Sequence, residues 1–385
     1  MQYFYFDHNA TTPVSPQVLE TAVECRGQVY GNASSIHRFG QAAKQRLESA
    51  RRQTASAIGC QPTEVVFLSG GTEADNLAVL GTVRHVQRSS RHVITTAIEH
   101  PAVLNACAQL EREGVAVTYV RPGADGIVDP EEIRRALRAD TVLVSVMHAN
   151  NELGTVQPVT EIAAIARAAG VCLHVDGVQA LGKIPVNVAT LGADLYSMSG
   201  HKIYAPKGIG ALYVRRGTKL APLVFGGHHE RDRRAGTENV PGAAAFGCAA
   251  ELAKACLEED ARRIGELRDR LEGAILERIP HTGVNGNRAA RTPNTSNMYF
   301  DGLESEALVI ALDLGGFAVS GGAACSSGAV EPSHVLTAIG LGADRARSSI
   351  RFSLGRGNTV EQVDALVDAV AAAVTRLRKL SPVTV

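Results

Sequence analysis

The sequence predicts an α/β fold, with a large domain built on a mostly parallel seven-stranded sheet between helices and a smaller α+β domain. Short apolar runs alternate with helix-like stretches over the first two thirds of the chain, which is typical of a parallel sheet covered on both faces. The length of 385 residues suits two domains. We expect residues 14–258 to form the large domain, and residues 1–13 and 259–385 to form the small one.

The predicted strands of the large domain are short apolar runs: Glu64–Leu68, His92–Thr96, Ala116–Val120, Val142–Met147, Cys172–Val175, Leu195–Met198 and Ala211–Val214. The helix-like stretches are Gln41–Ile58, Asp75–Arg88, Ala102–Glu113, Glu131–Arg138 and Val159–Ala168. From Ala243 to Arg278 apolar residues recur at helical spacing among many charges, so we predict one long helix that bridges the domains. The small domain should contain strands at Ser296–Phe300 and Ala318–Ser320, and helices at Ser305–Leu312 and Thr359–Leu380.

Charge and cysteine content exclude several classes of protein. The 39 Lys and Arg residues balance 39 Asp and Glu residues, which argues against direct binding of nucleic acid or an anionic membrane. We see no targeting segment and no membrane span. The seven cysteines are odd in number and contain no CxxC pair, so we expect free thiols, no structural metal and a cytoplasmic location.

Two motifs follow predicted strands and suggest a carbonyl cofactor. Lys202 comes directly after the run DLYSMSGH, and a poorly hydrated amine at a strand end can act as a nucleophile or form a Schiff base. Asp176 ends the strand VCLHV, where open parallel sheets bind ligands, and Gln179 lies three residues further on. A carboxylate there can keep a pyridine nitrogen protonated. The structural alternatives are a surface lysine in a turn and a helix N-cap at Asp176.

A glycine-rich turn and a histidine follow two other strands. Gly71 and Thr72 lie in SGGTEADN, between a strand and a helix, where backbone N–H groups and a hydroxyl can bind phosphate. His100 ends the run HVITTAIEH and could stack on a planar cofactor or move a proton. A simple capped turn and a buried structural histidine remain open as alternatives.

The segment Ser320–Gly328 consists only of Gly, Ala, Ser and Cys, and it includes Cys325. Since no bulky side chain holds this segment, we expect a mobile, exposed loop whose thiol is a candidate nucleophile. The alternative is a glycine-rich hairpin with an incidental cysteine. Arg351 could bind a substrate carboxylate in a bidentate manner or form a surface ion pair, and Thr237 could add a hydroxyl to a phosphate site.

Nine motifs in order make the chain similar to the cysteine desulfurases of the NifS/IscS group, which are pyridoxal-phosphate enzymes of fold type I in the class-V aminotransferase superfamily. The motifs are FDHNATTP, SGGTEADN, EHPAVL, MHANNELG, HVDGVQA, SGHKIYAPKG, RAGTEN, SGGAACSSGAVEPSHVL and IRFSLGR. The resemblance covers essentially the whole chain. One departure is Gly31-Asn32-Ala33-Ser34, where the family often has a proline after the asparagine.

The resemblance implies roles around pyridoxal phosphate. Lys202 would hold the cofactor through a Schiff base, and His100 would stack over the ring and assist proton transfer. Asp176 would face the pyridine nitrogen, and Gln179 the phenolic oxygen. A further set of residues would bind the phosphate group: Gly71, Thr72, Ser199, His201 and, from a second subunit, Thr237.

The resemblance also implies the reaction and its partners. Asn151 and Arg351 would orient the carboxylate of L-cysteine, and Cys325 would take the sulfur as a persulfide while alanine leaves. The enzyme would be a homodimer that passes sulfur to an acceptor protein, such as an iron–sulfur scaffold or a thiolation protein. The alternatives are a class-V aminotransferase or selenocysteine lyase on the same fold, and a non-catalytic scaffold.

Overall fold

The computed structural model describes residues 3–321 and 332–380. Its seven-stranded sheet has the order β2-β8-β7-β6-β5-β3-β4. Strand β8 runs antiparallel to β2 and β7, and all other neighbours are parallel, which confirms the predicted mostly parallel sheet. The strands are β2 (Val65–Leu68), β3 (His92–Thr96), β4 (Ala116–Val120), β5 (Thr141–Met147), β6 (Cys172–Asp176), β7 (Leu195–Ser199) and β8 (Gly210–Val214).

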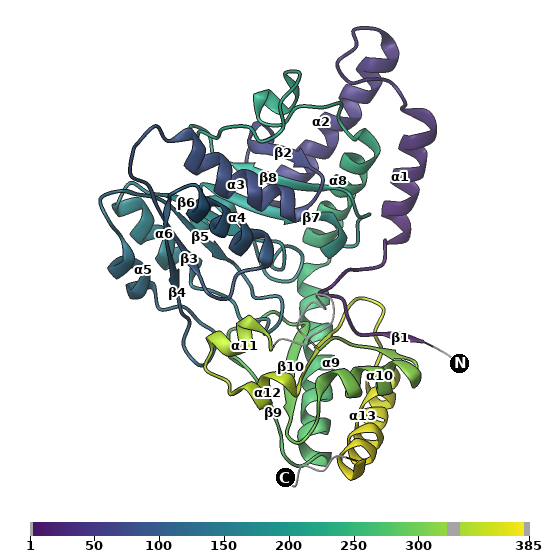
Figure 1. The fold of residues 1–385 in the computed structure, drawn as a ribbon. Helices are drawn as coiled ribbons and strands as arrows, with labels where there is room; N and C mark the ends of the chain where they lie inside the picture. Colours follow the sequence, from purple (N-terminus) through teal and green to yellow (C-terminus); the bar gives the residue numbers. More distant parts are fainter. Residues whose placement is uncertain (1–2, 322–331, 381–385) are drawn as a thin grey trace.

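Helices cover both faces of this sheet (Figure 1). Successive side chains of a strand point to opposite faces, so Val65 and Phe67 pack in one apolar cluster while Val66 and Leu68 pack in another. The first cluster includes side chains of α2 (Arg38–Ile58), α6 (Val159–Ala168) and α8 (Val240–Ala255), and the second includes α3 (Gly71–His85). Helix α4 (Pro101–Arg112) packs beside α3. The shorter or peripheral helices are α1 (Pro16–Gln28), α5 (Pro130–Ala136) and α7 (Val188–Leu191).

The predicted single helix from Ala243 to Arg278 is wrong. Helix α8 ends at Ala255 and α9 (Leu257–Arg278) begins after Cys256, with a bend of 71° between them. The Cys256 N–H still bonds the Leu252 carbonyl oxygen, but three acidic residues, Glu258, Glu259 and Asp260, follow in the first turn of α9. Acidic side chains favour a helix N-terminus, so the chain starts a new helix here. The bend lets α8 pack on α1 and α2, and α9 on α13 (Val360–Leu380).

A second apolar core lies around α9 and α13, at the bottom of Figure 1. An antiparallel sheet of β9 (Thr282–Val284), β10 (Thr295–Phe300) and β12 (Ser349–Ser353) packs there, and β1 (Phe4–Tyr5) pairs in parallel with β11 (Phe317–Ala318). The remaining helices are α10 (Ser305–Leu314), α11 (His334–Ala338) and α12 (Ala343–Arg347). The N-terminal Phe6 is fully buried in this second core. The domain boundaries at residues 14 and 258 stay a prediction.

The predicted strand Ala318–Ser320 is shorter than expected. Strand β11 ends at Ala318, and Ser320 forms only an isolated bridge to Arg351. Strand β12, which carries Arg351, was not predicted, because its sequence SIRFS has only two apolar residues, with an arginine between them. Both strands matter for function since they bring Arg351 to the edge of the large domain.

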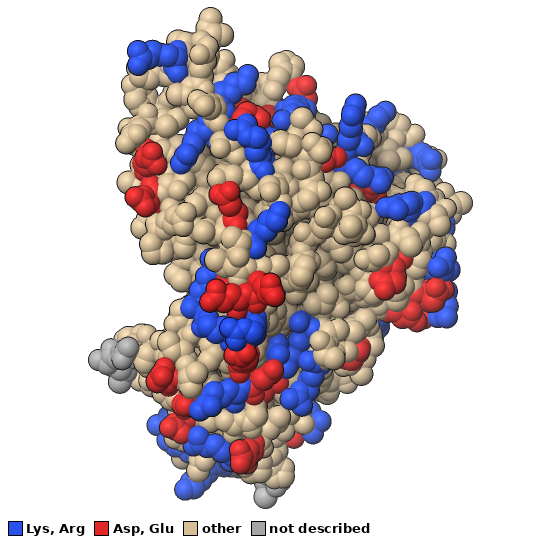
Figure 2. Space-filling view, turned by 180° about the vertical axis from the view of Figure 1, so that it is seen from behind, with Lys and Arg blue, Asp and Glu red and all other residues tan. Residues whose placement is uncertain are grey.

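The charged surface and the helices have two further properties. On the face shown in Figure 2, basic and acidic side chains are interspersed over both lobes, so this face carries no large field of one sign. Taken one at a time, none of the helices in residues 3–321 and 332–380 has both the length and the apolar character that a membrane span needs. Only the bent pair α8 and α9 meets those criteria when combined.

Candidate active site

A cavity of about 420 Å³ opens where the parallel strands of the large sheet end. Strand β5 ends at Met147, β6 at Asp176 and β7 at Ser199, and all three residues line the cavity. Carboxyl ends of parallel strands meet at one sheet edge, which is where open α/β sheets bind ligands. Most of the residues predicted from the sequence lie here: Gly71, Thr72, His100, Asn151, Asp176, Gln179, Ser199, His201, Lys202 and Arg351.

One predicted residue that the structure describes, Thr237, does not line this cavity. Thr237 lines a separate cavity of about 230 Å³, beside Glu230 and Arg234. Cys325 lies outside the described residues. Its role stays a prediction from the sequence.

Sequence reasoning missed six residues that also line the main cavity: Asn9, Ala10, Asp75, Met147, Val178 and Ser320. Asn9 and Ala10 belong to the motif FDHNATTP, which contributed to the resemblance but received no role. The position of that motif near the N-terminus, far from the other motifs in sequence, gave no sign that it lies beside Lys202.

Lys202 ends a single 3₁₀ turn, Gly200–Lys202, that follows β7 directly. Its Nζ atom donates to the carbonyl oxygen of Ala10 at 2.7 Å and to that of Asn9. Burial and the nearby positive charge of Arg351 lower the pKa of Lys202 to about 8. An appreciable fraction of this amine is therefore unprotonated, and nucleophilic, near neutral pH.

Asp176 is held at the end of β6 by its own turn. The Val178 N–H donates to Asp176 Oδ1 at 2.9 Å, and the carboxyl is 5% exposed. Burial raises the pKa of Asp176 to about 6, although the Val178 N–H and the charge of Lys202 oppose the shift. The turn requires glycine at position 177, since a Cβ atom there would lie 1.9 Å from Cζ of Tyr196. Asp176 is thus mostly ionised at neutral pH.

His100 caps helix α4, and this contact determines its tautomer. The Ala102 N–H donates to His100 Nδ1 at 3.1 Å, so the ring proton of the neutral form lies on Nε2. Burial, with the charges of Lys202 and His334, lowers the pKa of His100 to about 4. The imidazole is therefore neutral at pH 7 and has its Nε2–H free to interact in the cavity.

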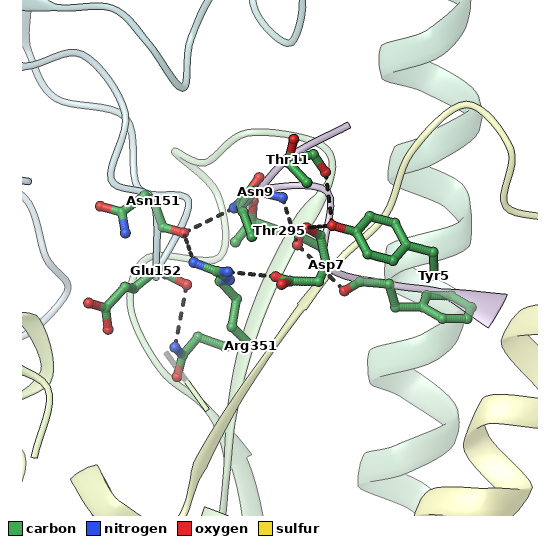
Figure 3. Close-up of polar contacts among 12 residues, drawn as sticks. Tyr5, Asp7, Asn9, Thr11, Asn151, Glu152, Thr295 and Arg351 are labelled. Atoms are coloured by element: carbon green, nitrogen blue, oxygen red, sulfur yellow. Dashed lines mark hydrogen bonds and ion pairs between the residues drawn. The ribbon is translucent and has the colours of Figure 1, made fainter. Parts of the chain in front are cut away.

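Arg351, on β12, lines the cavity, and Figure 3 shows its guanidinium between Asn151 and Asp7. Its Nη1 atom donates to the carbonyl oxygen of Asn151 at 3.0 Å, and its Nη2 atom pairs with Asp7 Oδ1 at 2.6 Å. Asn9 Nδ2 donates to the same Asn151 carbonyl at 3.1 Å. These contacts hold the guanidinium beside the cavity, where it can bind a carboxylate.

Comparisons with known proteins agree with this geometry. Residues 4–366 match the model of the family described as aminotransferase class-V. The chain belongs to this family. A cysteine desulfurase of Trichormus azollae is 48% identical over 382 residues, which cover 99% of this chain and 95% of the relative.

Solved structures show the same family relationship. A NifS-like protein superimposes with a TM-score of 0.92 at 35% identity, over 98% of this chain and 100% of that one. A protein described as SspA in complex with cysteine superimposes with a TM-score of 0.81 at 35% identity, over 91% of this chain and 98% of that one. The fold is therefore that of the NifS-like, fold type I enzymes, which depend on pyridoxal phosphate.

The residues of the cavity fit pyridoxal phosphate. Ser199 Oγ is buried and makes no hydrogen bond within the described ranges, although it lines the cavity close to the N-terminus of α3. With Thr72 and the first N–H groups of that 15-residue helix, this unused hydroxyl suits a phosphate group. Asp176 suits a pyridinium nitrogen, and Lys202 suits an aldehyde. No group of three or more His, Cys, Asp and Glu side chains in the described part of the chain is arranged to hold a metal.

The cofactor and the residues of the cavity would supply different parts of the chemistry. When bound, pyridoxal phosphate supplies an aldehyde that captures amines and a ring that withdraws electrons from the substrate's α-carbon. Lys202 would supply an amine that can also take up a proton beside that carbon. Asp176 would supply the negative charge that keeps a ring nitrogen protonated, and Arg351 would bind and orient the carboxylate of an amino acid.

Proposed function

We propose that this chain is a pyridoxal-phosphate-dependent cysteine desulfurase that converts L-cysteine to L-alanine and leaves a persulfide on Cys325. The observation that carries the proposal is the meeting of Lys202, Asp176 and Arg351 in one cavity. An amine, a ring-facing carboxylate and a guanidinium are what an enzyme acting on the α-carbon of an amino acid needs. The cysteine desulfurase relative and the cysteine complex of SspA support L-cysteine as that amino acid.

The proposed roles follow the cavity's geometry. Lys202 holds the cofactor, Asp176 faces its ring nitrogen and Gln179 its phenolic oxygen, and His100 stacks on the ring. Gly71, Thr72, Ser199 and His201 bind the phosphate group. Asn151 and Arg351 orient the substrate's carboxylate.

Cys325 is the proposed sulfur acceptor, and the overall reaction balances without a further reactant. The substrate's carbon–sulfur bond breaks, a sulfur–sulfur bond forms at Cys325, and the two thiol hydrogens end on the new methyl group of alanine and on the persulfide. Because Cys325 must be a free thiol before each turnover, a reducing compartment such as the cytoplasm suits the enzyme. The six described cysteines are all free.

A homodimer is the proposed assembly, in which Thr237 reaches the phosphate group of the other subunit. The cavity that Thr237 lines is separate from the main cavity of its own chain, which supports a role toward a second copy. Large apolar side chains are exposed on α1, α2 and the loops that follow α1 and β8: Tyr30, Ile36 and Phe225 are 73%, 92% and 84% exposed. Exposed apolar groups of this size favour an interface between copies.

The test is incubation of the purified holoenzyme with L-cysteine and a thiol reductant. We expect alanine and sulfide in equal amounts. Cys325→Ala should keep the coloured cofactor and lose sulfide formation, whereas Cys60→Ala, at a partly buried cysteine, should behave as wild type. Pyruvate or a new amino acid in place of alanine would indicate an aminotransferase. Retained sulfide formation by Cys325→Ala would refute the role of Cys325. The acceptor of the sulfur, an iron–sulfur scaffold or a thiolation protein, is then identified by persulfide transfer to purified candidates.

A further inference from the structure

Lys183 is an amine beside the cavity for which the proposed chemistry has no role. It lies four residues after Gln179, in the turn that follows β6. Its Nζ atom donates to Asn9 Oδ1 at 2.9 Å and to Gln179 Oε1. Both partners are buried, since Asn9 is 2% and Gln179 is 6% exposed. A lysine that donates hydrogen bonds to two buried amides beside the cavity therefore calls for a structural explanation.

The contact with Lys183 sets the orientation of the Gln179 amide. Gln179 Oε1 accepts from Lys183, while Gln179 Nε2 donates to the carbonyl oxygen of Asn9 at 3.0 Å. A flipped amide would set Nε2 against the lysine's donor and Oε1 against the Asn9 carbonyl, and both hydrogen bonds would be lost. Nε2 carries two hydrogens, and the Asn9 carbonyl uses one of them. The second is free for the cavity that Gln179 lines.

Asn9 connects this lysine to the rest of the site. Its carbonyl oxygen accepts from Lys202 Nζ, and its Nδ2 atom donates to Thr295 Oγ1 at 2.8 Å and to the Asn151 carbonyl (Figure 3). Its Oδ1 atom accepts from Asn294 Nδ2 at 2.9 Å as well as from Lys183. The second contact of Lys183 therefore supports the residue that holds the amine of Lys202.

We propose that Lys183 is a positioning residue, which fixes the amides of Gln179 and Asn9 so that a Gln179 N–H points at the phenolic oxygen of bound pyridoxal phosphate. The inference rests on the proposed function, which gives Gln179 that partner. A flipped Gln179 amide would set Oε1 against the Asn9 carbonyl oxygen in either protonation state of Lys183, so the preference for the observed orientation does not depend on the charge of Lys183.

Charged groups surround Lys183 on several elements. Burial and the charges of Lys202 and Arg351 lower the pKa of Lys183 well below its ordinary value. The charge of Lys183 in turn lowers the pKa values of His8 and His201. Any pH measurement on a Lys183 variant must therefore separate the lost N–H donor from the lost charge.

The experiment is a pH titration of the visible absorbance band of the holoenzyme, in a double-mutant cycle of Lys183→Met and Gln179→Ala. Loss of an N–H donor to the phenolic oxygen disfavours its ionised form, so each single variant should raise the band's midpoint by about one pH unit. If Lys183 acts through Gln179, Lys183→Met should add no shift in the Gln179→Ala background. The matched control is Lys219→Met, at an exposed lysine whose side chain makes no hydrogen bond or ion pair within the described ranges, and it should titrate as wild type.

Each other outcome overturns the inference. An unshifted band in Lys183→Met means that Lys183 does not orient Gln179. A full additional shift in the Gln179→Ala background means that Lys183 acts through its charge alone. If Lys183→Met does not fold, Lys183→Leu, which also removes the N–H donor, enters the same cycle and is judged by the same additivity. A wild-type enzyme that lacks a visible band, or yields no alanine, refutes the proposed function instead.

Discussion

The guanidinium of Arg351 and the carboxylate of Asp7 form an ion pair of 2.6 Å, although β12 and the N-terminal segment are 344 residues apart in sequence (Figure 3). The Arg351 side chain is 6% exposed and the Asp7 side chain 20%. With the Asn151 carbonyl on its other side, the guanidinium is held in one orientation toward the cavity. Through this pair Arg351, which lies in the small antiparallel sheet, contributes to the cavity at the end of the large sheet.

Arg351→Lys should weaken the binding of L-cysteine more than it slows turnover. A lysine keeps the charge but loses the planar pair of donors, and charged hydrogen bonds contribute roughly 1.5–3 kcal/mol, so KM should rise about 10- to 100-fold. Steady-state alanine formation measures KM and kcat separately. Arg345→Lys, at an exposed arginine that pairs with Asp301, is the control. An unchanged KM would remove Arg351 from the substrate site.

The rate at which the apoenzyme takes up pyridoxal phosphate should rise with pH through a midpoint near pH 8 and level off above about pH 9. The unprotonated amine of Lys202 is the nucleophile, and its pKa is about 8. Because the negative charge of Asp7 raises this pKa, Asp7→Asn should move the profile to lower pH. Growth of the visible band in a stopped-flow instrument measures the rate. Asp140→Asn, at a surface carboxylate distant from Lys202 in the fold, serves as the comparison, and a profile that moves to higher pH in Asp7→Asn would contradict the assignment.

Glu230→Gln should destabilise the protein by about 3–5 kcal/mol, since it removes the buried counter-charge of Arg51 and leaves only the partly exposed Glu48 as its ion-pair partner. Arg51 binds Glu230 through Nη1 and Nη2, each at 2.8 Å, and both side chains are 3% exposed. Glu230 and Thr237 lie in the same segment, between β8 and α8. Thermal unfolding of the two apoproteins measures the loss. The matched control is Glu266→Gln, which breaks the exposed pair with Arg262 and should cost less than about 1 kcal/mol. Equal losses of stability in the two variants would show that the buried ion pair contributes no more to stability than the exposed one.

His148→Gln should change how stability depends on acid. Burial lowers the pKa of His148 to about 4, so between pH 6.5 and 4 the unfolded chain binds a proton at this site that the folded chain does not. Through His148, the free energy of unfolding is therefore highest above pH 6.5 and falls as the pH drops toward 4. Glutamine does not titrate. As the pH falls from 6.5 to 4, the free energy of unfolding of the variant should therefore rise relative to that of wild type by roughly 2–3 kcal/mol, measured by urea unfolding at each pH. A constant difference between the two proteins would show that His148 titrates normally.

The fold could be predicted where a single sequence pattern, such as a short apolar run, determines the local structure. Strands β2, β3 and β5 are short runs in which every residue is buried, and the order of strands and helices predicts parallel neighbours. The break at Cys256 was not predictable from periodicity, because the apolar spacing continues through it and only packing on two different cores separates α8 from α9.

The site was predictable in part for a similar reason. Strand ends such as Asp176 and Lys202 carry polar residues directly after apolar runs, and that contrast is visible in the sequence. Asn9 and Lys183 lie in segments without such a contrast. Their importance comes from hydrogen bonds to residues that are distant in sequence, including Thr295 and Lys202.

The sequence by itself determined the strands of the large sheet and most of its helices, and which residue types stand at the strand ends, because burial and periodicity act locally along the chain. Only the tertiary structure decided which of those ends face a common cavity, that Arg351 crosses to Asp7 and Asn151, and that Lys183 and Asn9 lie beside the amine of Lys202. These are contacts between distant segments, and their geometry depends on how two cores pack together rather than on any pattern within one segment.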